Sequence, residues 1–158
     1  MKTKIEISAG GIVFKVLPIT DNRQPITVWL ICQHSQHKGW TFPKGLIGDK
    51  EKDEPMEQAA LREVREEGGI EAKIINPEPI MVKYFYQWSG SPHGGDSNEK
   101  ILVNKTVYYY LMEYFSGDPK DHDWEMSDAK FMTEDEVRKS LTFKTDKEAF
   151  DKILLLIK

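Results

Sequence analysis

The sequence predicts a mixed α/β fold, because β-rich runs and helical patterns follow one another along the chain. Alternating and β-branched residues mark strands, and apolar residues at helical spacing mark two helices. The order is strands, a helix, further strands and a last helix, which is typical of helices packed on a mixed sheet. The 158 residues suit one domain, which we take as residues 1–158.

Two strands are predicted before the first helix. Residues 5–14 begin with alternating apolar and polar side chains, and Gly10 and Gly11 suggest a bulge there. Residues 27–32 form a second β-rich run. The segment between them holds prolines, Asp and Asn, which favour a turn. We therefore expect the two strands to pair through this turn.

The first helix is predicted over residues 54–67. Apolar side chains recur there at helical spacing, at Met56, Ala60, Leu61 and Val64. Pro55 suits the first helical turn, and the glycine pair at 68–69 suits the end.

The second half of the chain repeats the pattern of strands followed by a helix. Residues 80–88 and 101–115 are β-rich, and residues 89–98 between them have the composition of a loop. Residues 146–158 predict a helix whose apolar face is formed by Phe150, Ile153, Leu154 and Ile157.

Composition narrows the class of protein. Lys and Arg number 22 against 26 Asp and Glu, a net charge of −4, so a general nucleic-acid surface is not expected. The longest apolar run, residues 107–112, is far shorter than the roughly twenty residues of a membrane span. A single cysteine, Cys32, excludes an intramolecular disulfide. We therefore expect a cytoplasmic protein that binds no membrane.

Three glutamates of the first predicted helix point to a metal site. Glu63, Glu66 and Glu67 lie within an arc of about 100°, where they repel one another and oppose the helix dipole. A divalent cation reverses both penalties, and carboxylate oxygens suit Mg²⁺ or Mn²⁺. The alternative is an ordinary charged helix face, in which Arg62 and Arg65 form surface ion pairs.

A wider pattern favours the metal site. Nine positions share one spacing motif: Gly48, Glu54, Arg62, Glu63, Val64, Glu66, Glu67, Gly69 and Ile70. In this motif the chain closely resembles the Nudix hydrolase family. The resemblance implies an α/β/α sandwich around a mixed β-sheet. It also implies Mg²⁺- or Mn²⁺-dependent cleavage of a nucleoside diphosphate linked to another group.

The glycine that opens the motif has two candidates. Gly48 has the required spacing to Glu54, whereas Gly45 follows Pro43 and Lys44, as the family's glycine often does. We favour Gly45 with a three-residue insertion after it. In that interpretation, Gly45 rather than Gly48 offers its backbone carbonyl to the metal.

The resemblance also implies roles for the charged residues. Glu66 and Glu67 are the main metal ligands, and Glu63 is a third ligand or the base that deprotonates water. Arg62 holds a glutamate in position, while Glu54 caps the helix behind the ligands. A further acid often precedes a strand in this family. Glu125 fits best, with Asp121, Asp123 and an ordinary acidic loop as alternatives.

Three other stretches resemble the diadenosine polyphosphate hydrolases within the family: residues 8–14, 40–45 and 105–111. The resemblance implies that Lys105 contacts phosphate and that a nearby tyrosine stacks on adenine. The tyrosine candidates are Tyr84, Tyr86, Tyr108 and Tyr110, with Tyr86 and Tyr108 preferred. Ordinary packing on strands is the alternative for the tyrosines. Lys44, like Lys105, is a candidate substrate contact because it neighbours the predicted phosphate site, and a solvated surface position is the alternative for both lysines.

The histidines and the absence of a nucleophile motif complete the expectations. The four histidines lack zinc-type spacing, although His34 or His37 would suit the mouth of a pocket. No Ser or Cys nucleophile pattern favours a covalent mechanism. We therefore expect a metal-dependent pyrophosphohydrolase acting on small nucleotides, foremost dinucleoside polyphosphates. The alternatives are nucleoside triphosphates, the 5′ end of RNA, or nucleotide binding without cleavage.

Overall fold

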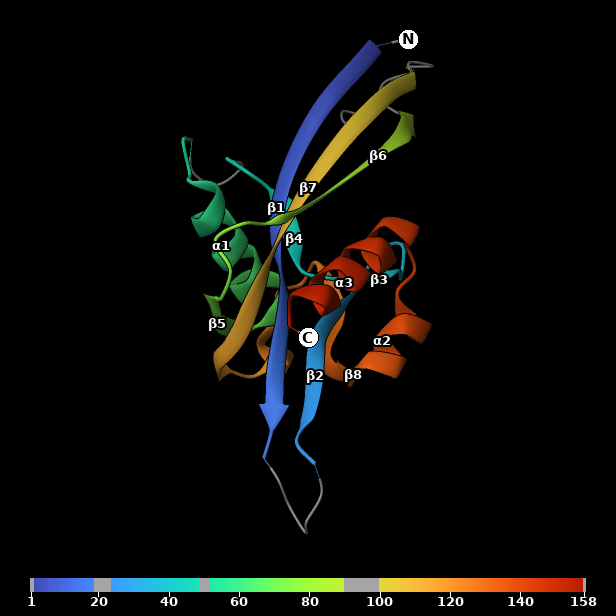
Figure 1. Ribbon diagram of the computed structural model, residues 1–158. Helices are drawn as coiled ribbons and strands as arrows, with labels where there is room; N and C mark the ends of the chain where they lie inside the picture. The colour runs from blue at the N-terminus through green and yellow to red at the C-terminus, as the bar shows by residue number, and fades with distance from the viewer. Residues whose placement is uncertain (1, 19–23, 49–51, 90–99, 158) are drawn as a thin grey trace.

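The centre of the protein is a mixed β-sheet. The computed structural model describes residues 2–18, 24–48, 52–89 and 100–157, and within them the sheet has eight strands. Its two longest strands are parallel neighbours, β1 (Lys2–Leu17) and β7 (Lys100–Gly117). Together with β6 (Ile80–Ser89), they extend beyond the helices at the top of Figure 1.

The strands at the start of the chain pair as expected. β2 (Ile26–His34) runs antiparallel to the end of β1, so the predicted pairing is confirmed, although residues 19–23 of the turn lie outside the described residues. The other edge of β2 carries β8 (Met126–Thr133). The short β3 (Trp40–Thr41) lies on the same edge of β2 as β1, opposite β8 and beyond the residues that pair with β1. β4 (Lys44–Leu46) pairs with the middle of β1.

The bulge predicted at Gly10 and Gly11 is wrong. β1 pairs with β7 in one continuous register through both glycines. Glycine is needed at position 10 for a different reason, because a Cβ there would lie 2.1 Å from the carbonyl oxygen of Pro43. The same carbonyl accepts a hydrogen bond from the Gly11 N–H at 3.1 Å. The pair therefore lets the chain before β4 cross closely over β1.

β7 is long enough to pair with two strands on one edge. β6 is antiparallel to its first half, and β5 (Ile70–Ile74) to its second half. The sequence analysis predicted β6 and β7 but not β5, which follows the first helix directly. The loop predicted at residues 89–98 lies almost entirely outside the described residues.

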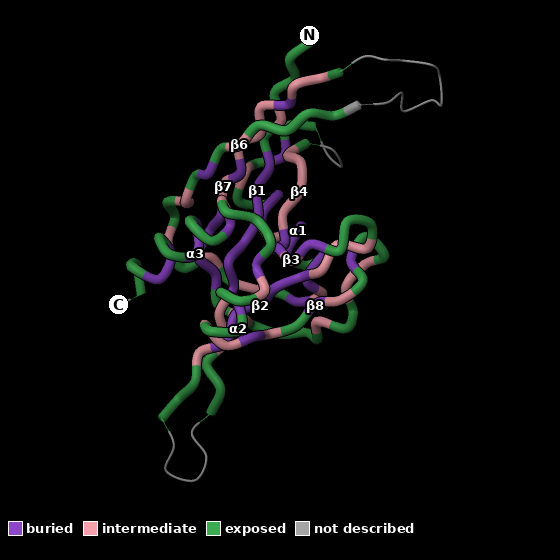
Figure 2. Tube along the Cα trace, turned by 90° about the vertical axis from the view of Figure 1, so that its right-hand side faces the viewer, coloured by how far each residue is buried: buried purple, intermediate pink, exposed green. Residues whose placement is uncertain are grey.

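Helices cover both faces of the sheet, which confirms the α/β sandwich (Figure 1). α1 (Met56–Gly68) packs on one face, against Ala9, Val13 and neighbouring residues. α2 (Glu134–Ser140) and α3 (Lys144–Leu156) pack on the other, around Trp29 and Phe150. Figure 2 shows buried residues concentrated along the central strands between these layers. Among the described helices, none has the length and apolar character to cross a membrane.

Helix α1 has well-defined ends, and its last two turns carry three glutamates of the motif. Pro55 is the N-cap and therefore just precedes the helix, and Gly69 ends it in the left-handed conformation at φ 73°. Glu63 and Glu67 are buried although they are charged. Two carboxyl groups buried beside a sheet need hydrogen-bond donors or positive charges as partners, which is typical of a functional site.

Candidate active site

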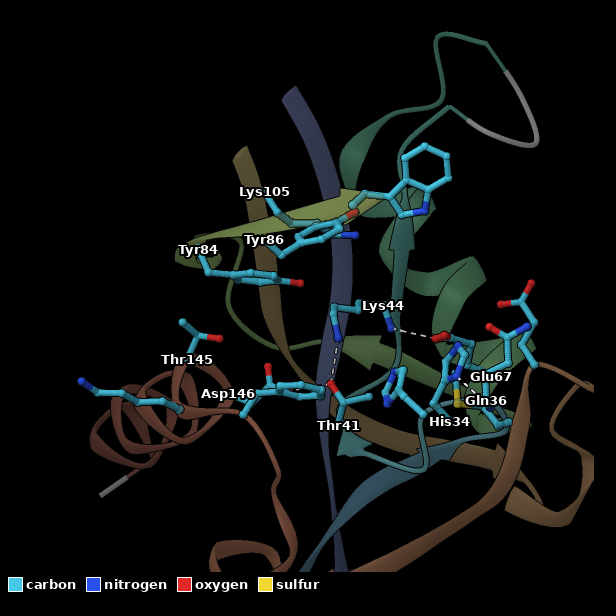
Figure 3. A pocket seen from close by; sticks show the side chains of 16 residues that line it. His34, Gln36, Thr41, Lys44, Glu67, Tyr84, Tyr86, Lys105, Thr145 and Asp146 are labelled. Atoms are coloured by element: carbon cyan, nitrogen blue, oxygen red, sulfur yellow. Dashed lines mark hydrogen bonds between the residues drawn. The ribbon is translucent and has the colours of Figure 1, made fainter. Parts of the chain in front are cut away.

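A cavity of about 810 Å³ is bounded by one face of β6 and β7, by the end of α1 and by the start of α3 (Figure 3). Its charged lining residues come from distant parts of the chain: Lys44, Glu67, Lys105, Glu125, Lys144 and Asp146. Its aromatic lining residues are Tyr84, Tyr86, Trp88, His34, His37 and Phe143. The volume is within the range of small-molecule sites, and the lining joins aromatic surface with charges of both signs.

Arg62 connects the glutamates of α1 to the loop before the helix. Its guanidinium donates to both oxygens of Glu54, from Nε at 2.8 Å and from Nη2 at 2.9 Å. Nη1 donates to Glu63 at 2.8 Å and to Glu66 at 3.2 Å. Because Arg62 and Glu54 are buried, this is not the exposed surface pairing of the alternative interpretation. The arrangement agrees with the expectation that Arg62 holds a glutamate in position.

The hydrogen bonds to Arg62 shift the ionisation of the pair. The guanidinium lowers the pKa of Glu54, and hydrogen bonding to Glu54 raises the pKa of Arg62. Both groups are therefore charged at neutral pH. One planar guanidinium orients three glutamates, since two of its nitrogens bind Glu54 and the third donates to Glu63 and Glu66.

Glu67 is the most strongly buried of the three glutamates that the motif places together. Its Oε1 accepts a hydrogen bond from the backbone N–H of Lys44 at 3.3 Å. Burial raises the pKa of Glu67 well above its usual range, and the charges of Glu63 and Glu125 add to this effect while Lys44 opposes it. Glu67 thus lies where a further positive charge would stabilise its carboxylate.

Of the acids considered before β8, Glu125 alone lines the cavity. Its backbone carbonyl accepts from the N–H of Ser35 at 3.0 Å. The neighbouring Asp123 donates its backbone N–H to the carbonyl of Glu66 at 2.8 Å, and its side chain accepts from the Glu125 N–H. Asp121 is exposed in the short 3₁₀ turn η1 (Pro119–Asp121). The loop is therefore held against the end of α1 with Glu125 facing the cavity.

The two candidate glycines differ in what constrains them. A Cβ at Gly45 would lie 2.2 Å from the carboxylate of Glu63, so only glycine leaves room for that side chain. Gly48 instead has a left-handed backbone, with φ 83°, and its backbone hydrogen bond contributes to the lowered pKa of Glu54. Gly45 is thus adjacent to the glutamates, whereas Gly48 shapes the loop behind them.

The donor set fits a divalent ion of the Mg²⁺ or Mn²⁺ type. The residues that would hold it are Glu63, Glu66, Glu67 and the carbonyl of Gly45, all oxygen donors, and the carboxylate of Glu63 lies directly against Gly45. Among the described residues, no three acidic, His or Cys side chains already surround one point as a metal site. In the structure two of the glutamates are instead held by Arg62.

Tyr84, Tyr86 and Lys105 lie together on the pocket side of the sheet, but Tyr108 does not. Tyr84 is paired with Lys105, and both line the cavity with Tyr86. Tyr108 pairs with Met81, three positions along the strand from Lys105, and does not line the cavity. Successive side chains of a strand point to opposite faces, so Tyr108 faces the α1 side. The preference for Tyr108 as a stacking residue is therefore corrected, and Tyr110 packs in the α1 core.

A carboxylate that the sequence analysis missed connects Tyr86 to Lys105. The Tyr86 hydroxyl donates to Glu6 at 2.6 Å, and the Lys105 ammonium lies 3.7 Å from the same carboxylate. Burial alone would raise the pKa of Glu6, but the hydrogen bond from Tyr86 and the nearby lysines lower it. Burial also lowers the pKa of Lys105. Glu6 could not be found from the sequence, because its position depends on the parallel pairing of β1 with β7.

A second missed group surrounds Lys44. Its ammonium donates to the hydroxyl of Thr41 at 2.8 Å, and Thr41 donates to Asp146 at 2.7 Å (Figure 3). The other oxygen of Asp146 accepts from the hydroxyl of Tyr109 at 2.7 Å. Thr41, Asp146 and Tyr109 are all buried. A polar residue on the apolar side of a predicted helix was the available indication for Asp146.

The two histidines that were expected near the pocket mouth line the cavity. The rings of His34 and His37 are stacked, with centroids 4.1 Å apart, and His37 also meets the edge of Phe143. Burial lowers the pKa of His37, and the nearby His34 and Lys44 add to the effect. His37 therefore offers an aromatic ring that is mainly uncharged at neutral pH.

Sequence and fold comparisons agree on the class of protein. Residues 11–153 match the family model of the NUDIX domain, so the chain belongs to the Nudix family. The predicted resemblance is thereby confirmed at the level of the family and of the fold.

Individual relatives are more varied. The chain is 30% identical to a putative mutator protein, MutT4, of Mycobacterium tuberculosis, over 84% of this chain and 48% of the relative. It is 29% identical to the NAD-capped RNA hydrolase NudC of Vibrio vulnificus, over 67% of this chain and 34% of the relative. The chain thus spans about half or less of these proteins. A C. elegans Ap4A hydrolase in a binary complex has the same fold, with TM-score 0.71, 21% identity and coverage of 96% and 97% of the two chains.

Proposed function

We propose that this chain is a single-domain, metal-dependent pyrophosphohydrolase that cleaves nucleoside diphosphates linked to another group, foremost dinucleoside polyphosphates. The observation that supports the proposal is one cavity lined by Glu67, Glu125, three lysines and several aromatic rings. Carboxylates suit a metal ion, lysines suit a phosphate chain, and aromatic faces suit nucleobases.

A divalent ion bound at the glutamates of α1 would lower the pKa of a water molecule and offset charge on the leaving phosphate. In the proposed arrangement, Arg62 keeps Glu63 and Glu66 oriented through its hydrogen bonds. Glu63 or Glu125 accepts the proton of the attacking water. Glu63 is positioned against Gly45, and Glu125 lines the cavity.

The proposed substrate contacts lie on the walls of the cavity. Lys44 and Lys105 bind the phosphate chain, because of the three lysines that line the cavity these two interact electrostatically with Glu67. Tyr86 offers a ring for base stacking, and Tyr84 lies beside it with ring centroids 6.2 Å apart. A dinucleoside polyphosphate presents both a long anionic chain and aromatic bases, so it uses both kinds of wall.

The named activities of the sequence relatives support a second class of substrate. One relative is named for NAD-capped RNA hydrolysis and another as a putative mutator protein. Nucleoside triphosphates and RNA 5′ ends are therefore the second candidates. Nucleotide binding without cleavage is disfavoured, because every carboxylate of the motif is present and three of them, Glu54, Glu63 and Glu67, are buried.

Product analysis by chromatography separates these alternatives. The purified chain with Mg²⁺ is offered diadenosine polyphosphates, nucleoside triphosphates, a nucleotide sugar and triphosphorylated RNA. We expect a diadenosine polyphosphate to be cleaved with the highest kcat/KM and no product in excess chelator. Faster cleavage of a triphosphate or of RNA would replace the substrate assignment. Binding of all substrates with cleavage of none would replace the enzymatic function.

A further inference from the structure

The ammonium of Lys44 is held in place by a chain of hydrogen bonds that begins far away in the sequence. Lys44 lies in β4 and donates to the Thr41 hydroxyl at 2.8 Å. Asp146, near the start of α3, accepts from the same hydroxyl at 2.7 Å. The three groups therefore connect the C-terminal helix to a lysine of the cavity wall (Figure 3).

The direction of each hydrogen bond follows from the chemistry of the partners. A carboxylate accepts only, so the single hydroxyl hydrogen of Thr41 points to Asp146. The lone pairs of the Thr41 oxygen are then left for the ammonium, which donates only. Asp146 thus determines the orientation in which Thr41 receives Lys44.

Burial makes this orientation rigid. Thr41 and Asp146 line the cavity but are only 4% and 3% exposed, so water competes little for either side chain. Tyr109, which is fully buried, occupies the other oxygen of Asp146 from β7. Both oxygens of the Asp146 carboxylate therefore accept a hydrogen bond. Any other rotamer of Asp146 would leave a buried polar group unpaired, which is costly.

We propose that Asp146 is a positioning residue, which acts through the Thr41 hydroxyl to fix the Lys44 ammonium where the phosphate chain of the substrate passes. The inference rests on the proposed function, in which Lys44 contacts phosphate. Asp146 and Thr41 do not themselves bind the phosphate chain. A lysine stem without this acceptor would sample several rotamers, and binding would then require one of them to be selected.

The test compares Thr41→Val, which keeps the shape of the side chain and removes the hydroxyl, with Thr41→Ser, which keeps the hydroxyl. Binding of inorganic tripolyphosphate is measured by calorimetry in chelator and at low salt, so that the metal ligands take no part. Thr41→Val is expected to weaken binding about tenfold, as for loss of one hydrogen bond to a charged group. Thr41→Ser is expected to restore binding to within about threefold of the wild type.

The same substitution in a Lys44→Met background identifies the route of the effect. If Thr41 acts through Lys44, Thr41→Val causes no further loss once Lys44 is replaced. Asp146→Ala, which removes both acceptor oxygens, is expected to behave like Thr41→Val in both backgrounds, and it carries the test if Thr41→Val does not fold. Ile153→Ala, a buried change elsewhere in α3, controls for general loss of stability and is expected to leave tripolyphosphate binding unchanged.

The outcomes separate this inference from the proposed function. Equal losses from Thr41→Val with and without Lys44, or no loss at all, would overturn the positioning role. If Lys44→Met still impaired hydrolysis of the preferred nucleotide in that case, the proposed function would stand although the positioning role of Asp146 had failed. A wild-type protein that neither bound tripolyphosphate nor cleaved any nucleotide would overturn both.

Discussion

Arg62 donates two hydrogen bonds, of 2.8 and 2.9 Å, to the two carboxylate oxygens of Glu54, and both side chains are buried. The two residues are eight positions apart, so the fork joins the loop before α1 to the middle of the helix. The remaining guanidinium nitrogen holds Glu63 and Glu66. Through this geometry, the stability of the loop and the placement of the glutamates depend on one side chain.

Arg62→Lys keeps the charge but cannot form the fork, because an ammonium lacks the planar pair of donors. We expect the free energy of unfolding to fall by about 2–3 kcal/mol, as for loss of buried charged hydrogen bonds. Hydrolysis is expected to fall at least about tenfold, since Glu63 and Glu66 lose their shared donor. Urea unfolding and steady-state kinetics measure the two effects. Arg65→Lys, on the exposed side of the same helix, is the matched control; equal behaviour of the two variants would contradict the prediction.

The lowered pKa of Glu54 predicts how stability varies with pH. A carboxyl group whose folded pKa is depressed stabilises the protein above its unfolded pKa, near 4.5. That contribution is lost as the pH falls through the folded pKa. Glu54→Gln is therefore expected to be less stable than the wild type by about 1–2 kcal/mol at pH 7. The difference should shrink below pH 4.5, where urea unfolding across a pH series would detect it; a difference constant with pH would refute the pairing.

Glu67 has the opposite shift and so the opposite sign. Because its folded pKa is raised, Glu67 destabilises the metal-free protein above its unfolded pKa, near 4.5, and this cost declines as the pH falls from the folded pKa toward that value. Glu67→Gln in chelator should therefore melt at a higher temperature than the wild type at pH 7.5 and show a smaller difference at pH 5. Hydrolysis should fall by about 100-fold or more, as a metal ligand is lost.

Added Mg²⁺ provides the control for Glu67. We expect it to raise the melting temperature of the wild type and to have less effect on Glu67→Gln, because the ion relieves the same repulsion. Full hydrolysis by the wild type in excess chelator would contradict the metal assignment.

Gly45 and Gly48 should respond to alanine in different measurements. At Gly45 the added methyl group meets the carboxylate of Glu63 and displaces it from its hydrogen bond to Arg62, so we expect a loss of activity of about tenfold or more. At Gly48 the methyl group meets a left-handed backbone, and stability should fall by about 1 kcal/mol while hydrolysis is largely kept. Thermal unfolding and kcat/KM for both variants test this crossed pattern. The reverse ranking in activity would make Gly48 the glycine beside the ligands.

Tyr86 tests the base-stacking part of the proposal. Removing its ring in Tyr86→Ala should raise KM for a diadenosine polyphosphate by roughly 5- to 150-fold, the cost of one base stack. Inorganic tripolyphosphate has no base, so its binding should change far less. Tyr86→Phe keeps the ring and loses only the hydrogen bond to Glu6, which makes it the matched control. Equal losses for both ligands in Tyr86→Ala would assign the ring to packing alone.

Much of the fold was predictable because its patterns are local. Helix α1 was expected over residues 54–67 and spans Met56–Gly68, since apolar spacing, a proline and a glycine pair mark it in the sequence. The motif on that helix predicted the family, which the match over residues 11–153 shows. β5 and α2 were missed, because short elements that take their stability from neighbouring strands and helices leave weak local patterns.

The placement of Tyr108 was predictable in part. Lys105 and Tyr108 are three positions apart on one strand, so they point to opposite faces, and the spacing alone excludes a shared wall. Which face carries the cavity was a different matter. It depends on where α1 and α3 pack, and no single strand contains that information.

The sequence by itself determined the elements, the charged motif and the family, because helical and strand periodicity and short spacings are properties of neighbouring residues. Only the tertiary structure decided that Glu6 meets Tyr86 and Lys105, and that Asp146 reaches Lys44 through Thr41. Each of these contacts joins segments far apart in the chain. Their geometry is set by sheet register and by helix packing, which arise from the burial of apolar surface over the whole domain rather than from the residues in contact.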